Sequence, residues 1–158
     1  MGLDMYLSAA TYLDDFDNTP SEEKAAYARV LTEVGIARFE PLHGLRFATV
    51  KLVVACWKNA YQVHDWLIAQ TSDGGDIRLA EREIARQDLV KLTDLCKQLL
   101  KEKDRERANE LLPAPTSCLE GEGGWDFYWW NLEATVRQLE AVLKDPQFAE
   151  WEFFYLAS

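Results

Sequence analysis

The chain has 158 residues, of which 48% are hydrophobic, and its 17 basic and 27 acidic side chains give a net charge of −10. This length predicts a single domain, residues 1–158, that can bury a core without disulfides or metal ions. The negative charge argues against general DNA or RNA binding, because proteins of that kind need a basic surface to displace counterions from phosphates.

The cysteines and the start of the chain bear on the compartment. Cys56, Cys96 and Cys118 are odd in number and widely spaced, which is typical of thiols kept reduced in a cytoplasm. No Cys and His spacing resembles a zinc site, so we expect no metal and no cofactor. The first ten residues lack the basic segment of a signal peptide, and no apolar run approaches the roughly 20 residues of a membrane span. We therefore expect a cytoplasmic protein that does not bind membranes.

The first predicted element is a strand at residues 2–8. Apolar side chains alternate there with others, which is typical of a strand with one buried face. The side chains expected on the buried face are Leu3, Met5 and Leu7.

A helix is predicted next, with Thr19 as its cap, Pro20 in the first helical position and Glu22 completing a capping box. Gly35 is placed to end this helix. Residues 36–47 contain a proline and a glycine, and we expect an irregular crossing there.

The central prediction is one long helix over residues 48–70. At about 100° per residue its apolar side chains cover a wide arc, which indicates the most buried helix of the fold. His64 lies well inside this arc and is either a core residue or part of a site. The β-branched residues near Val50 leave open a strand in place of the first turns.

The next segment should contain a turn at 71–76, a possible short strand at 77–84 and an amphipathic helix at 86–103. A short helix that ends at 111–113 and a loop at 113–124 follow. A further helix should begin near Asp126, which is a good N-cap residue.

The chain ends in the alternating aromatic segment 151–156, which predicts a strand. This strand can pair with residues 2–8 and so tie both termini into one sheet. The predicted fold class is α+β, with three to four helices packed on a small antiparallel sheet formed by the chain termini.

At several positions the sequence resembles a family of small bacteriophage and prophage proteins that begin Met-Gly-Leu-Asp-Met-Tyr-Leu. Residues 1–7 repeat that opening unaltered. The family's helix Trp-Arg-Lys-Ala-Asn-x-Ile-His-x-Trp-Phe corresponds to residues 57–67, although Asn59 and Tyr61 stand where the family has Lys and Asn. A Leu-Leu-Pro element at 111–113 and the aromatic C-terminus also match. The resemblance implies a phage accessory protein in the cytoplasm of an infected bacterium.

Motifs of catalysis are weak in this sequence. It has no phosphate-binding Gly-rich loop, no nucleophile elbow and no HExxH motif. The histidines are His43 and His64, and Cys56 lies two turns from His64 on the expected helix, too far for direct activation. We therefore expect no catalytic residues and do not favour an enzyme, while leaving that class open.

Two aromatic clusters suggest a pocket for a planar, anionic ligand. Aromatic faces stack on bases, and lysine side chains and helix starts hold phosphates. The alternative is that these clusters are ordinary packing, with His64 a hydrogen-bonded core residue. The predicted ligand-binding residues are Trp57, Lys58, Tyr61, His64, Trp125, Asp126 and Trp129.

Two functions follow from these expectations. The first is binding and sequestering a small nucleotide-like ligand, such as a cyclic nucleotide-type signal of bacterial immunity, without catalysis. The alternative is a protein–protein interaction module that docks on and inhibits a host protein through its acidic, aromatic C-terminal face. Exposed aromatics near the C-terminus would also favour a homo-oligomer, most simply a dimer.

Overall fold

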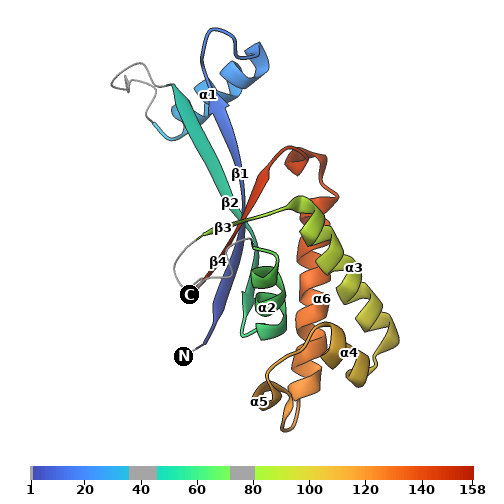
Figure 1. The fold of residues 1–158 in the computed structure, drawn as a ribbon. Helices are drawn as coiled ribbons and strands as arrows, with labels where there is room; N and C mark the ends of the chain where they lie inside the picture. The colour runs from blue at the N-terminus through green and yellow to red at the C-terminus, as the bar shows by residue number, and fades with distance from the viewer. Residues whose placement is uncertain (1, 36–45, 72–80) are drawn as a thin grey trace. The chain divides into compact units, whose positions relative to one another are not determined.

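The computed structural model describes residues 2–35, 46–71 and 81–158 (Figure 1). Four strands form one antiparallel sheet in the order β2-β1-β4-β3. The strands are β1 (Asp4–Asp14), β2 (Phe47–Lys58), β3 (Arg82–Ile84) and β4 (Glu152–Ala157). The described residues form six α-helices: α1 (Ser21–Glu33), α2 (Tyr61–Ala69), α3 (Arg86–Glu102), α4 (Arg105–Leu111), α5 (Thr116–Leu119) and α6 (Gly124–Leu143). The predicted α+β class is confirmed.

The chain termini pair as expected. The backbone N–H of Asp4 donates to the carbonyl of Ser158 at 3.0 Å, and the N–H of Ser158 donates back to Asp4 at 2.9 Å. Phe153, Tyr155 and Ala157 are almost completely buried, whereas the residues between them are only half-buried. This alternation gives β4 one face that packs into the core.

The prediction of one helix over residues 48–70 is wrong. Its first part is β2, and the helix α2 begins only at Tyr61. Asn59 separates the two with a φ of 55°, a left-handed conformation that asparagine tolerates better than most residues. Its N–H donates to the carbonyl of Leu3 at 2.8 Å, and its Oδ1 accepts from the N–H of Leu3 at 2.8 Å. Pairing with β1 therefore outweighs the helical periodicity of this segment.

Two expected helix caps are also corrected. Pro20, not Thr19, is the N-cap residue of α1, because the Thr19 hydroxyl donates to Asp14 Oδ1 instead. The helix α6 starts after Gly123, whose φ is 88°, and Asp126 lies inside its first turn. Gly35 does follow the end of α1, with a φ of 74° that suits glycine.

Two compact units make up the fold, Met1–Ala9 with Leu52–Ser158, and Ala10–Lys51. The second unit contains α1 and the adjoining ends of β1 and β2. The first unit contains the other elements, with α3 and α6 side by side (Figure 1). Its core is built from fully buried side chains of the sheet and helices, including Met5, Leu7, Val63, Leu67, Leu89, Leu92, Leu99, Leu132, Leu139 and Phe153. That all 158 residues act as a single domain stays a prediction.

The aromatic C-terminus is not the exposed surface that we expected. Phe153 and Tyr155 are 1% and 0% exposed, and Trp151 is half-buried. The large apolar side chains that are exposed belong to other segments: Tyr6, Tyr12, Phe16, Val34, Phe47, Leu52, Val53, Phe127 and Trp130. A homodimer stays a prediction, and these exposed residues are candidates for its interface.

The expectations for residues 36–45, which include His43, and for residues 72–80 lie outside the described residues. Within the described part of the chain, no helix has both the length and the apolar character needed to cross a membrane.

Candidate functional site

The seven predicted site residues do not line one common pocket. Trp57 and Lys58 end β2 and line one cleft. Trp125 and Asp126 line a different pocket at the start of α6. The other three predicted residues are Tyr61 and His64 on α2 and Trp129 on α6.

The first cleft has a volume of about 260 Å³. Three aromatic side chains from three elements, Tyr6, Trp57 and Trp130, contribute to its walls. Its complete lining comes from β1, β2 and α6: Asp4, Tyr6, Cys56, Trp57, Lys58, Trp130, Asn131 and Ala134. All of these residues belong to one compact unit. We call this the β2–α6 cleft.

Two hydrogen bonds attach β2 to α6 along this cleft. Trp57 Nε1 donates to Thr135 Oγ1 at 2.9 Å, and the backbone N–H of Cys56 donates to Gln138 Oε1 at 2.8 Å. Trp57 is only 5% exposed, so most of its ring is core and little of it faces the opening. These bonds hold β2 against α6 beside the cleft.

Trp130 forms the exposed wall. Its side chain is 55% exposed and stacks on Phe127, with the ring centroids 5.9 Å apart and the planes at 17°. The two rings are one helical turn apart on α6, so the helix itself holds them in place. A rigid, exposed indole beside a cleft is a suitable surface for stacking a planar group.

Asn131 is the polar residue that sequence analysis missed. It is 2% exposed and lines the cleft. Thr135 Oγ1 donates to its backbone carbonyl, and the described residues provide no hydrogen-bond partner for its side-chain amide. The amide atoms are not fully enclosed, so they are open to the cleft and can bond to a ligand there. Sequence reasoning treated the aromatic run around it as stacking surface and gave no weight to the asparagine within it.

The cleft carries one charge of each sign. Lys58 is exposed at the end of β2, and Asp4 is half-buried at the start of β1. The ammonium group can attract a ligand anion, whereas the carboxylate can only accept hydrogen bonds from a ligand N–H or O–H.

The second pocket is more polar and has a volume of about 300 Å³. Here the guanidinium of Arg105 lies over the ring of Trp125, with 5.3 Å between its Cζ and the ring centroid. Lys103 Nζ lies 5.0 Å from the ring centroid of the neighbouring Trp129. Because cations of the chain already cover these two indoles, they are less suited to stacking a ligand than Trp130.

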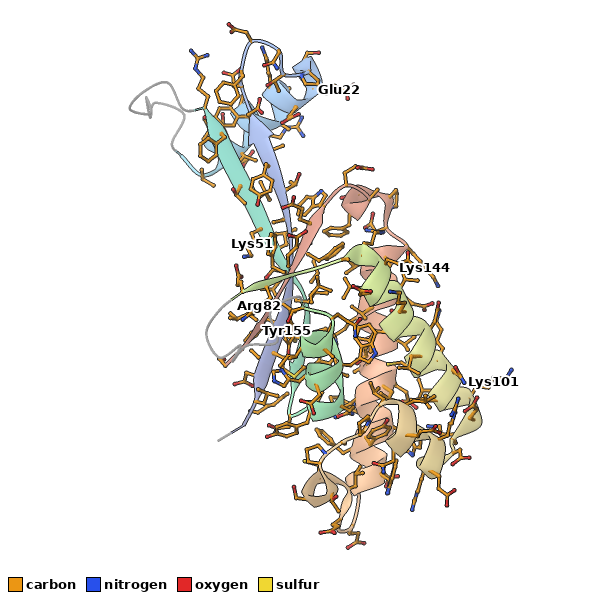
Figure 2. All side chains as sticks on the ribbon, viewed as in Figure 1. Glu22, Lys51, Arg82, Lys101, Lys144 and Tyr155 are labelled. Carbon is orange, nitrogen blue, oxygen red and sulfur yellow. The ribbon has the colours of Figure 1, made fainter. Side chains whose placement is uncertain are left out.

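His64 contacts a core residue. Its Nδ1 lies 2.6 Å from the hydroxyl oxygen of Tyr155. Tyr155, which is labelled in Figure 2, belongs to β4 and is 0% exposed. Burial, and to a lesser degree the negative charge of Asp65, raises the pKa of Tyr155. The tyrosine therefore stays protonated and can donate its proton to Nδ1. This contact favours the structural interpretation of His64, with a tyrosine as its partner.

Comparison with known proteins gives no match: no family model, curated protein or solved structure matches this chain.

Proposed function

We propose that this protein binds and sequesters a small, planar, nucleotide-like ligand in the β2–α6 cleft, without catalysing a reaction. The observation that carries the proposal is the cleft itself, which Tyr6, Trp57 and Trp130 line together with the amide-bearing Asn131. Apolar and aromatic walls with a few polar groups are typical of small-molecule sites.

The size of the cleft limits the ligand. Its volume of about 260 Å³ lies below the roughly 300–1,000 Å³ of sites for drug-sized molecules. One base would therefore occupy the cleft, while the sugar and phosphate stay outside, within reach of Lys58. A cyclic dinucleotide would insert only one of its bases.

Binding without chemistry fits the lining residues. None of the eight lining residues is a histidine, which is a common activating base for a cysteine nucleophile. The resemblance to phage proteins implies an accessory protein in an infected bacterium, where sequestration would have a biological role. A phage protein that holds a cyclic nucleotide-type signal would lower its free concentration and so weaken the immune response of the infected bacterium.

Calorimetry tests this proposal. We expect the wild-type protein to bind at least one of AMP, cyclic AMP, a cyclic dinucleotide or a cyclic ADP-ribose, and Trp130→Ala to bind it at least about tenfold more weakly. Phe47→Ala is a matched control, because Phe47 is 57% exposed and lies on the other compact unit. The proposal is wrong if no ligand binds, or if Trp130→Ala binds as tightly as Phe47→Ala.

Docking on a host protein remains the second candidate, although it needs a different surface from the one first expected. The buried β4 aromatics are unavailable, whereas Phe127 and Trp130 present an exposed pair of rings on α6. Loss of a host-protein interaction in Trp130→Ala, together with no ligand binding by the wild type, would favour this candidate.

A further inference from the structure

The inference concerns which bases the β2–α6 cleft accepts, and it rests on the proposed function. Asn131 is buried on α6, its amide is unpaired within the described residues, and it lines the cleft. The amide is accessible to solvent in the cleft. A ligand can therefore bond to it without breaking a hydrogen bond within the described chain.

The amide alone does not distinguish bases. A carboxamide offers a donor and an acceptor side by side, and it can turn over to match either order on a base edge. Asn131 therefore provides affinity for any base that has a donor next to an acceptor.

Asp4 makes the distinction. It lines the same cleft from β1, and its backbone groups are already used in the pair with Ser158. An ionised carboxylate accepts hydrogen bonds and never donates them. It bonds to an amino group of a ligand and repels a carbonyl oxygen in the same position.

We propose that the cleft selects bases with an exocyclic amine over those with a carbonyl in its place. One amine N–H donates to Asn131 Oδ1 and the other donates to the Asp4 carboxylate. The ring nitrogen next to the amine accepts from the Asn131 amide, in the manner that asparagine reads adenine. The ring itself stacks on Trp130. Adenine and cytosine fit this description, whereas hypoxanthine and uracil do not.

Two ligand pairs test the selection, AMP against IMP and CMP against UMP. The members of a pair have the same charge and nearly the same size, and they differ in whether an amine or a carbonyl stands on the ring. We expect the wild type to bind the amine-bearing member at least about tenfold more tightly. Equal binding within both pairs would overturn the inference and leave the proposed function standing. If no nucleotide binds at all, the proposed function itself fails.

Asp4→Asn is the matched variant for selectivity. The new side chain has the same shape but can donate to a carbonyl, so we expect AMP and IMP to bind equally. Asn131→Leu has a different expected result, in which every nucleotide binds about tenfold or more weakly while AMP still exceeds IMP. If Asp4→Asn keeps the full preference for AMP, Asp4 does not select.

Thiol alkylation shows where the nucleotide binds, and it tests the inference in the wild type even if Asn131→Leu folds poorly. Cys56 is exposed in the cleft, Cys118 is half-exposed outside it, and Cys96 is buried. Saturating AMP should slow iodoacetamide modification of Cys56 in the wild type, as measured by mass spectrometry of its peptide, and leave Cys118 unchanged. IMP at the same concentration should protect Cys56 less. Protection of Cys118 instead of Cys56 would place the ligand elsewhere and overturn the inference.

Discussion

Two regions of this molecule contain polar side chains next to the core, and within the described residues these have a hydrogen-bond partner in one region and lack one in the other. Between α2 and β4, His64 Nδ1 and the Tyr155 hydroxyl lie 2.6 Å apart. In the β2–α6 cleft, the amide of Asn131 has no partner within the described residues and reaches the solvent. Pairing stabilises the folded state, whereas a polar group open to the cleft adds little to stability and is available to a ligand. The presence or absence of a partner therefore separates a structural polar contact from a candidate site, whereas the residue types alone do not.

The largest expected effect distinguishes two tryptophans of the cleft. Trp57 is 5% exposed and bonded to Thr135, whereas Trp130 is 55% exposed. We expect Trp57→Ala to lower the free energy of unfolding by about 3–5 kcal/mol. Trp130→Ala should change it by no more than about 0.5 kcal/mol while weakening ligand binding. Urea unfolding followed by circular dichroism measures both values. If Trp130→Ala is the less stable variant, the exposed wall of the cleft is misassigned.

The next largest loss of stability is expected at the contact between His64 and Tyr155. Tyr155→Phe keeps the ring but removes the hydroxyl next to His64, and we expect a loss of about 1–3 kcal/mol in the free energy of unfolding. Tyr6→Phe is the control, because it removes a hydroxyl from a tyrosine that is 38% exposed. Asn131→Leu gives the opposite case, because the amide of Asn131 has no bond within the described chain to lose. We therefore expect this variant to be at least as stable as the wild type. A large loss in Asn131→Leu would remove the contrast between the two regions.

The elements that could be predicted from sequence are those whose local pattern and tertiary partner agree. In β1 the alternation holds over residues 4–7 and is followed by a run of buried residues at 8–10, whereas β4 alternates throughout because one of its faces packs into the core. The helix predicted at 86–103 is α3, whose buried residues include Leu89, Leu92, Cys96 and Leu99. Burial also raises the pKa of Cys96 to about 12, as suits a thiol that acts as a core side chain.

Prediction failed where distant residues decide the structure. The segment 48–58 has enough apolar residues to fit a helix, but the Leu3 backbone bonds to Asn59 and aligns it as a strand. The β-branched residues and the asparagine were the local signals for this, and the wide apolar arc outweighed them. The cleft was missed for the same reason, because Tyr6 and Trp130 meet only after the sheet and α6 have packed. Of the seven predicted site residues, only Trp57 and Lys58 line it.

The smallest expected effect extends the comparison to the surface of α6, where Glu140 is fully paired. Its Oε1 lies 2.8 Å from Lys144 Nζ and 2.7 Å from Lys97 Nζ, which joins α6 to α3; Lys144 is labelled in Figure 2. Hydrogen bonds from Lys144 and then Lys97 lower the pKa of Glu140 from 4.5 to about 2. A carboxylate with a lowered pKa in the folded state stabilises it above pH 4.5, and this contribution is lost as the pH falls toward 2.

We therefore expect Glu140→Gln to be slightly less stable than the wild type near pH 7 and to approach it between pH 4.5 and 2. Salt at about 1 M should shrink the difference at pH 7, because the three groups lie at the surface and are screened. Thermal unfolding of both proteins across this pH range measures the difference, and a gap that stays constant down to pH 2 would show that the lysines do not hold Glu140 ionised.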